Sequence, residues 1–86
     1  MTKIFSIKYK FGICWYKNGT DTLHKETGPA KIYSNGSRFW YKNGLAHRTD
    51  GPAREFINGK KEYWLNGIKY PYIKTNEEWL IFQIIN

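Results

Sequence analysis

Residues 40–59 carry the features that decide the fold, and they read WYKNGLAHRTDGPAREFING. Two Asn-Gly pairs lie in this stretch, at Asn43-Gly44 and at Asn58-Gly59. Asn-Gly is the strongest short-range signal of a β-hairpin, because a type I′ turn needs a positive φ at both central residues and these two residues tolerate it. The stretch therefore predicts hairpins that turn at both pairs.

The same signal recurs along the whole chain. Eight glycines lie seven to nine residues apart, and five of them follow an asparagine. Turns at this spacing leave about six residues between them, which is the usual length of a strand. The intervals are rich in strand-forming residues, as in RFWY at 38–41 and EYWL at 62–65. We expect antiparallel β structure over residues 3–69, beginning with a strand over 3–11.

The chain is also a repeat. Gly28-Pro29-Ala30 returns as Gly51-Pro52-Ala53 at a shift of 23, and WYKNG at 15–19 returns unchanged at 40–44. A third copy is only partly preserved. Aligning identical residues places Trp64 at the position of Trp40, and Tyr70 occupies the position of His47. Units of this size cannot bury their aromatic faces alone, so we expect them to stack on one another.

An odd number of chain reversals in each unit would invert the chain direction from one repeat to the next and place equivalent residues at opposite edges. Repeats that stack by translation therefore need an even number of reversals. We therefore expect hairpins at the two Asn-Gly turns, and corners or bulged crossings at the Gly-Pro segments around residues 28–29 and 51–52. Proline agrees with this, because it cannot donate a ladder hydrogen bond and favours strand starts and bulges. The predicted fold is mainly β: antiparallel hairpin repeats form one twisted sheet within a single domain, 1–86, with about two and a half repeats over 12–69.

The C-terminal segment predicts a short α-helix over residues 75–85. Thr75 with Glu78 three residues later forms a capping box, and Glu77 and Glu78 suit the positive end of the helix dipole. After the first turn almost every side chain is apolar, so the helix needs cover on more than one side. Two readings remain open: the helix caps the end of the sheet, or part of it forms a homo-oligomer interface.

Composition narrows the classes of function. The chain has 86 residues with a formal net charge of +7, and 19% of its residues are aromatic, which excludes a disordered tail. A single cysteine, Cys14, rules out an internal disulfide framework and a thiolate zinc site. No apolar run reaches the roughly 20 residues of a membrane span, and the first residues lack the apolar core of a secretory signal. The expected location is the cytoplasm.

The sequence contains no recognisable catalytic motif. Nothing resembles a nucleophile elbow, a phosphate loop or a two-histidine metal helix, so we expect a protein that is not an enzyme and uses no cofactor or metal. His24 and His47 occupy equivalent repeat positions, which favours a structural role over two copies of an active site. We expect Asp50 to accept backbone N–H groups at the Gly51-Pro52 corner, with His47 and Arg48 bracing it.

The repeat resembles the MORN repeat, and more closely a MORN variant of the pattern W-Y-x-N-G-x-x-H-R-x-D-G-P-A-x-x-x-x-N-G found in small bacterial and bacteriophage proteins. The copy at 40–59 matches nearly every position, and the copy at 15–36 departs by a two-residue insertion and by Lys25 and Thr27. The resemblance covers about residues 12–69. It implies a non-catalytic binding surface for proteins or acidic phospholipid, and a related group is described as antitoxins.

Lysines and arginines interleaved with Tyr and Trp predict an anionic partner. The first hypothesis is a host protein with an acidic surface, bound by a bacteriophage-type or bacterial protein that acts as an inhibitor or antitoxin-like factor. The second is nucleic acid or an anionic nucleotide, and the third is acidic phospholipid at a membrane. The residues chosen as candidate binding residues are Trp40, Tyr41, His47, Arg48, Lys61 and Trp64. The structural alternative is that edge lysines block aggregation and that aromatic residues pair across strands.

Overall fold

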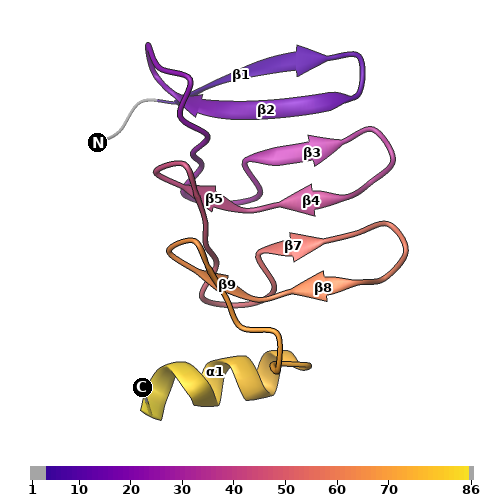
Figure 1. The fold of residues 1–86 in the computed structure, drawn as a ribbon. Helices are drawn as coiled ribbons and strands as arrows, with labels where there is room; N and C mark the ends of the chain where they lie inside the picture. Colours follow the sequence, from indigo (N-terminus) through magenta and orange to yellow (C-terminus); the bar gives the residue numbers. More distant parts are fainter. Residues whose placement is uncertain (1–3, 86) are drawn as a thin grey trace.

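The computed structural model describes residues 4–85, and it shows a flat stack of hairpins closed at one end by a helix (Figure 1). Its dimensions are 37 × 31 × 17 Å. The strands are β1 (Ile4–Tyr9), β2 (Gly12–Lys17), β3 (Lys31–Tyr33), β4 (Arg38–Phe39), β5 (Tyr41–Lys42), β6 (Leu45–Ala46), β7 (Arg54–Glu55), β8 (Lys61–Glu62), β9 (Trp64–Leu65) and β10 (Ile68–Lys69), and the helix α1 spans Asn76–Ile85. The predicted class, antiparallel hairpin repeats with a C-terminal helix, is confirmed. Lys3, the first residue of the strand predicted over 3–11, lies outside the described residues.

The strands divide between one sheet and two small ribbons. Six strands form an antiparallel sheet in the order β1-β2-β3-β4-β7-β8, while β5 pairs with β6 and β9 with β10. Figure 1 shows the ribbons on the opposite side of the stack from the hairpins β3–β4 and β7–β8. The sheet has the expected pairing, but the intervals predicted as six-residue strands are bent: the chain leaves the sheet at Trp40 and again at Tyr63. Each interval therefore supplies one short strand to the sheet and one to a ribbon.

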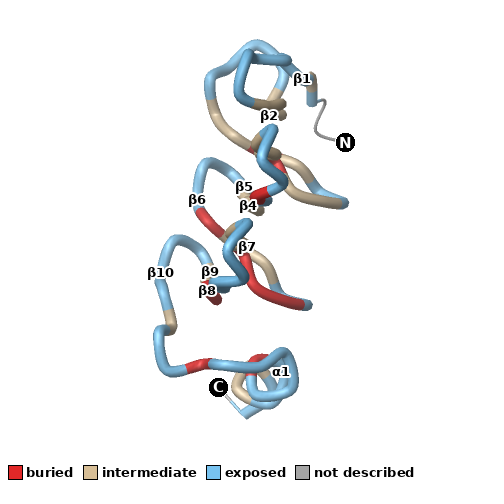
Figure 2. Tube along the Cα trace, turned by 90° about the vertical axis from the view of Figure 1, so that its right-hand side faces the viewer, coloured by how far each residue is buried: buried red, intermediate tan, exposed pale blue. Residues whose placement is uncertain are grey.

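Each unit contains two reversing turns and one crossing, as the stacking argument requires. The Asn-Gly pairs lie in the turns that join β3 to β4, β5 to β6, β7 to β8 and β9 to β10. The Gly-Pro-Ala segments lie outside the strands and lead the chain back to the sheet, from the β5–β6 ribbon in the case of residues 51–53. Residues 51–53 are buried, which Figure 2 shows as the buried backbone next to β7, and Ala30 in the preceding segment is buried as well.

The turns are of two kinds, which the Asn-Gly signal alone does not distinguish. Asn43-Gly44 and Asn66-Gly67 have positive φ at both residues, as the predicted type I′ turn requires. At residues 33–37 only Gly36 has a positive φ; its N–H donates to the Tyr33 carbonyl and the Tyr33 N–H donates to the Ser37 carbonyl, both at 2.9 Å. This is the three-residue loop in which a type I turn precedes a left-handed glycine. The turn at 56–60 repeats it, so the type I′ expectation was wrong at these two turns.

Backbone bonds show how the third unit aligns. The His24 N–H donates to the Trp15 carbonyl at 3.0 Å, and the His47 N–H donates to the Trp40 carbonyl at 3.1 Å. The corresponding bond in the third unit runs from the Tyr70 N–H to the Tyr63 carbonyl at 2.9 Å. Tyr70 therefore does take the place of His47, but Tyr63, and not Trp64, takes the place of Trp40.

The helix closes the last repeat. The capping box is formed: the Glu78 N–H donates to Thr75 Oγ1 at 3.1 Å, and the Thr75 N–H donates to Glu78 Oε1 at 3.0 Å. Trp79 is fully buried, and its ring centroid lies 5.4 Å from that of Tyr63 and 5.5 Å from that of Tyr70. The capping reading of the helix is confirmed by these contacts.

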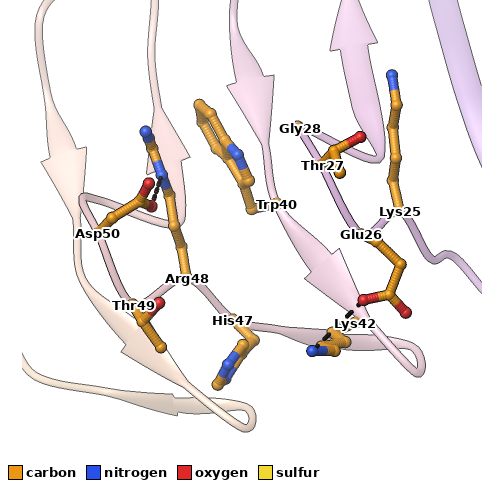
Figure 3. Close-up of a pocket in the computed structure, with 10 residues that line it drawn as sticks. All are labelled: Lys25, Glu26, Thr27, Gly28, Trp40, Lys42, His47, Arg48, Thr49 and Asp50. Carbon is orange, nitrogen blue, oxygen red and sulfur yellow. Dashed lines mark hydrogen bonds and ion pairs between the residues drawn. The ribbon is translucent and has the colours of Figure 1, made fainter.

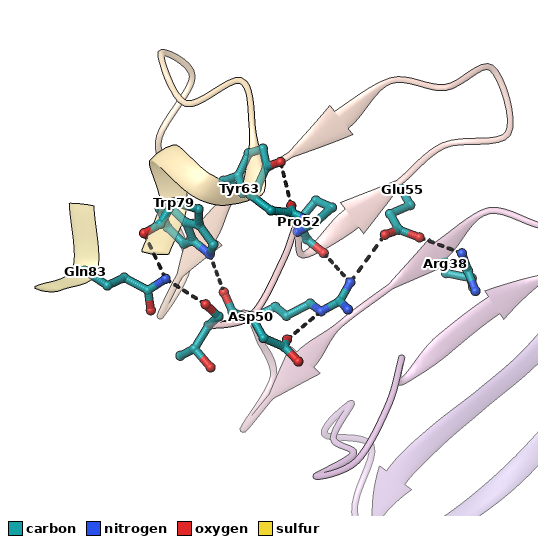
Figure 4. A network of polar contacts seen from close by, with 10 residues as sticks. Arg38, Asp50, Pro52, Glu55, Tyr63, Trp79 and Gln83 are labelled. Atoms are coloured by element: carbon teal, nitrogen blue, oxygen red, sulfur yellow. Dashed lines mark hydrogen bonds and ion pairs between the residues drawn. The ribbon is translucent and has the colours of Figure 1, made fainter. Parts of the chain in front are cut away.

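The helix is also tied to the preceding crossing by two hydrogen bonds. The Trp79 indole donates to the Arg48 carbonyl at 3.0 Å, and the Gln83 amide donates to the Thr49 carbonyl at 2.7 Å (Figure 4). Half of the other buried hydrophobic residues have small side chains, namely Ala30, Ala46 and Ala53. Trp79 is therefore the largest single contribution to the core.

We expect Trp79→Ala to lower the free energy of unfolding by about 3–5 kcal/mol, because it removes a fully buried aromatic side chain. Urea unfolding followed by circular dichroism measures this. Glu77→Ala is the matched control: Glu77 lies on the same helix but is exposed, so the loss there should stay within about 0.5 kcal/mol. Equal losses in the two variants would contradict the capping role of Trp79.

Candidate binding surfaces

A groove of about 490 Å³ lies between the crossings of the first two repeats (Figure 3). It brings together three of the six predicted residues, Trp40, His47 and Arg48. The remaining lining residues are Lys25, Glu26, Thr27, Gly28, Lys42, Thr49 and Asp50. The groove exists because the crossing at 24–28 and the crossing at 47–51 approach each other without a side chain large enough to fill the space between them.

Arg48 is held by its own neighbours. Its Nε donates to Asp50 Oδ1 at 2.9 Å, one terminal nitrogen donates to the Pro52 carbonyl at 3.1 Å, and the same nitrogen lies 3.3 Å from Glu55 Oε2 (Figure 4). The guanidinium carbon also lies 3.9 Å from the centroid of the Trp40 ring. The expected brace between Arg48 and Asp50 is confirmed, and most of the hydrogen-bonding capacity of Arg48 is used within the repeat.

The histidines have the structural role that the sequence favoured, but their partners differ from the one expected for His47. His47 Nδ1 accepts the N–H of Asn66 at 3.0 Å, and His24 Nδ1 accepts the N–H of Asn43 at 2.9 Å. Each imidazole thus satisfies a backbone donor in the Asn-Gly turn of the next repeat. The prediction that His47 braces Asp50 was wrong in its partner, because the ring points along the stack to the following turn.

An unprotonated Nδ1 is a condition for this bond. Burial lowers the pKa of His47, and the positive charge of Lys42 lowers it further. Both effects favour the neutral ring, the form in which Nδ1 can accept a hydrogen bond. His24 Nε2 in turn contacts Glu26 Oε1 at 2.7 Å, and Nε2 carries the proton because Nδ1 is the acceptor.

The charges of the groove are largely balanced from within. The hydrogen bond from His24 lowers the pKa of Glu26, and nearby Lys42, 3.5 Å away, adds to the effect. Lys25 lies with its Nζ 3.8 Å from the centroid of the Trp15 ring. With two carboxylates against three cations, the groove has mixed charge and lacks the concentrated positive charge that is typical of a phosphate site.

Tyr41 and Trp64 lie on a second surface, together with Arg54. Arg54 donates to the Tyr41 hydroxyl at 3.1 Å, and its guanidinium carbon lies 4.8 Å from the centroid of the Trp64 ring. Glu62 Oε1 is 3.8 Å from Arg54 and accepts the Trp64 indole N–H at 3.1 Å. Tyr41 and Trp64 are equivalent positions of neighbouring repeats, so Arg54 bridges two steps of the stack.

Lys61 lies at a third place, a hollow of about 590 Å³ formed with residues 69–74. Glu62 is buried there. Burial favours its neutral form, but hydrogen bonds from Lys69, at 3.1 Å, and from the Trp64 indole outweigh this and hold the pKa of Glu62 below its usual value. Lys60 Nζ is 3.7 Å from the same carboxylate, whereas Lys61 has no ion pair within residues 4–85. The structure thus distributes the six predicted residues over three places, of which the second and third share Glu62.

The N-terminal end of the stack forms a basic surface that the choice of the repeat residues missed. Lys8, Lys10 and Lys17 have no carboxylate within 4 Å among the residues that the structure describes. Beside them is an apolar hollow of about 360 Å³. Its lining is Tyr9, Phe11, Gly12, Ile13, Cys14, Tyr16, Lys31, Ile32 and Tyr33. The signal was present in the sequence as the alternation of lysine and aromatic residues in the first strand.

Two tyrosines lie close together at this apolar hollow. The hydroxyls of Tyr9 and Tyr16 are 2.9 Å apart, and the bond with Tyr9 raises the pKa of Tyr16. Cys14 is buried beneath them in β2 as a free thiol. Among residues 4–85 no group of three or more His, Cys, Asp or Glu side chains could hold a metal ion. α1 is too short to cross a membrane, and the described part of the chain contains no longer helix.

Comparisons with family models, with curated proteins and with solved structures found no match to this chain. The likeness to the MORN variant therefore remains a resemblance of sequence pattern.

We expect the lowered pKa of His47 to make stability depend on pH. Because the unfolded chain binds a proton more readily at this side chain, stability should be greatest above the unfolded pKa of about 6.5 and fall as the pH decreases below it. His47→Asn keeps an acceptor without a titrating ring, so its stability should change less between about pH 7.5 and 5. Urea unfolding at both pH values measures the difference, and identical pH dependence in wild type and variant would contradict the role of His47.

Proposed function

We propose that this protein is a non-catalytic binding protein that docks on the acidic surface of another protein. The observation that supports this most directly is the distribution of charge. Glu26, Glu55 and Glu62 pair with Arg38, Arg48, Arg54, Lys42 and Lys69, so the excess positive charge falls on lysines that have no such partner within residues 4–85. Three of these, Lys8, Lys10 and Lys17, lie on one hairpin.

The same hairpin carries exposed apolar side chains next to the lysines. Tyr9 is 48% exposed and Phe11 is 68% exposed. Aromatic residues near unpaired charge are typical of protein interfaces, where rings supply contact area and charges speed and orient association. The β1–β2 hairpin is therefore the preferred docking surface. The groove around Trp40, His47 and Arg48 is a second contact region in this proposal, with mixed charge suited to peptide.

The resemblance to small bacterial and bacteriophage repeat proteins supports a bacterial protein as the partner, and a cytoplasmic inhibitor or antitoxin-like factor as the role. Affinity purification from nuclease-treated bacterial lysate, followed by mass spectrometry, would identify that partner. Nucleic acid and acidic phospholipid are the alternatives. The apolar hollow beside Tyr9 and Phe11 and the internal pairing of the arginines favour a protein surface over a phosphate backbone, for which a continuous track of free cations is typical.

We expect Lys8→Glu/Lys10→Glu to weaken binding of fluorescent poly-L-glutamate at least about tenfold, because it reverses the unpaired charge of the docking hairpin. Fluorescence anisotropy at physiological salt measures the affinity. Lys60→Glu/Lys61→Glu makes the same change in net charge at the other end of the stack and should weaken binding much less. Equal losses would show that net charge alone governs binding and would contradict a localised surface.

The alternative partners are tested with the same proteins. Binding to a short oligothymidylate with a steep decrease of log K against log salt, and stronger than binding to polyglutamate, would favour nucleic acid. Co-sedimentation with phosphatidylserine vesicles but not phosphatidylcholine vesicles would favour acidic phospholipid.

Self-association through α1 is a separate proposal. The side of the helix opposite Trp79 exposes Leu80, Ile81, Ile84 and Ile85, at 49%, 51%, 82% and 74%. These positions form one stripe at helical spacing, and α1 has acidic but no basic side chains, which disfavours an anionic membrane as its cover. A second copy is the better occupant. Figure 1 places α1 at the opposite end of the stack from the lysine-rich β1–β2 hairpin, so a dimer through the helix keeps the most positive parts apart.

We expect wild type to sediment as a dimer at micromolar concentration and Ile84→Asp to sediment as a monomer with unchanged circular dichroism, because the charge lies in the centre of the proposed interface. Analytical ultracentrifugation measures the mass. The control is Ile68→Asp, at a residue that is 58% exposed on β10, and it should leave the mass unchanged. A monomeric wild type would contradict the proposal.

A further inference from the structure

The free edge of β1 is the longest unpaired strand edge in the described part of the chain. β1 and β2 each have six residues, whereas the other strands have two or three. β1 lies at one end of the sheet order, and the strand at the other end, β8, has only two residues. A short edge is protected from adding a further strand, while a six-residue edge is long enough to template one.

The register shows which backbone groups of β1 point outward. Ser6 is opposite Trp15 and Ile4 is opposite Lys17. The Trp15 N–H donates to the Ala30 carbonyl at 2.7 Å, and the Lys17 N–H donates to the Thr22 carbonyl at 2.9 Å, so both residues bond away from β1. Opposite residues in an antiparallel pair alternate between bonded and unbonded pairs. The N–H and C=O groups of Ile4, Ser6 and Lys8 therefore point out of the sheet.

The two faces beside this edge differ in chemistry. Side chains alternate along β1, so Phe5, Ile7 and Tyr9 lie on one face, and Ile4, Ser6 and Lys8 lie on the other. The first face continues on β2 with Cys14 and Tyr16, the residues opposite Ile7 and Phe5. The second continues with Trp15 and Lys17. A strand added to β1 thus meets aromatic and aliphatic groups on one face and lysines on the other.

We propose that β1 binds an extended segment of its partner as an additional strand, and that acidic and apolar residues alternate in that segment. Its backbone pairs with Ile4, Ser6 and Lys8, its apolar side chains lie beside Ile7 and Tyr9, and its carboxylates lie beside Lys8 and Lys17. This is recognition by strand addition, in which main-chain bonds supply affinity and alternate side chains supply specificity. The proposal rests on the proposed function, which it deepens by naming the form of the partner. A second copy of this chain does not fit, because two β1 edges would bring their lysines together.

The test is a titration of the full chain with a peptide of about eight residues in which glutamate alternates with valine, long enough to cover β1. Ser6→Pro removes one outward N–H and places a proline ring on the free edge, where the sheet itself tolerates it. We expect this variant to bind the peptide at least about tenfold more weakly than wild type. Ser6→Ala keeps the N–H and is the matched control, with affinity equal to wild type. A peptide in which lysine replaces glutamate should not bind.

Hydrogen exchange gives a second measurement that needs no variant. The amides of Ser6 and Lys8 should become protected when the peptide is bound, whereas those of Phe5 and Ile7 already bond to β2 in the free protein. If Ser6→Pro keeps its thermal unfolding and binds as wild type, or if Ser6 and Lys8 remain unprotected, strand addition is wrong. A retained effect of Lys8→Glu/Lys10→Glu on polyglutamate would then leave the proposed function in place, and loss of both effects would remove both proposals.

Discussion

The hydrogen bonds from the Asn-Gly turns of the two ribbons to the imidazole of the preceding repeat set the register between neighbouring repeats. Asn43 N–H reaches back to His24, and Asn66 N–H reaches back to His47, in each case over nineteen residues. A shape only 17 Å thick in its shortest dimension has little interior, and several of its buried residues are alanines. Neighbouring repeats are therefore held by directed contacts: these two bonds and the bridge of Arg54 between Tyr41 and Trp64. All of them require the same spacing between repeats.

The sequence alone predicted the features that depend on local chemistry. The Asn-Gly pairs located the hairpin turns, the need for an even number of reversals placed the Gly-Pro-Ala segments between strands, and Thr75 with Glu78 located the start of the helix. It did not predict the turn type at Asn35 and Asn58, because Asn-Gly also suits a type I turn followed by a left-handed glycine. The alignment of Trp64 failed for a related reason. Aligning the identical residues Trp40 and Trp64 shifts the third repeat by one residue, whereas the backbone hydrogen bonds align Tyr63 with Trp40.

The candidate site was less predictable, because a sequence does not show which charges neutralise each other. The sequence suggested that arginines are available to a partner, or that Arg48 braces a corner. In the fold Arg48 pairs with Glu55 of β7, and Arg54 pairs with Glu62 of β8. Conversely, Lys8 and Lys17 lie outside the best-preserved copy and received no special weight. Neither lysine has a carboxylate within 4 Å among residues 4–85, because the carboxylates that form ion pairs lie on later parts of the chain. The two ends of the molecule consequently differ: one is basic with an open strand edge, and the other is an apolar helix surface.

Trp79 occupies a position with a structural meaning beyond core packing. In the first two repeats a cation covers the ring at equivalent positions, Lys25 over Trp15 and Arg48 over Trp40, and at the equivalent Tyr63 the indole of Trp79 lies against the ring instead. The helix packs on the last unit, through Tyr63 and Tyr70, and bonds to the crossing before it at Arg48 and Thr49. Its docking site is consequently independent of how many units precede it. The number of repeats can therefore change without affecting the helix. A chain with one more repeat inserted ahead of residue 47 would have a longer stack, closed by the same helix in the same contacts.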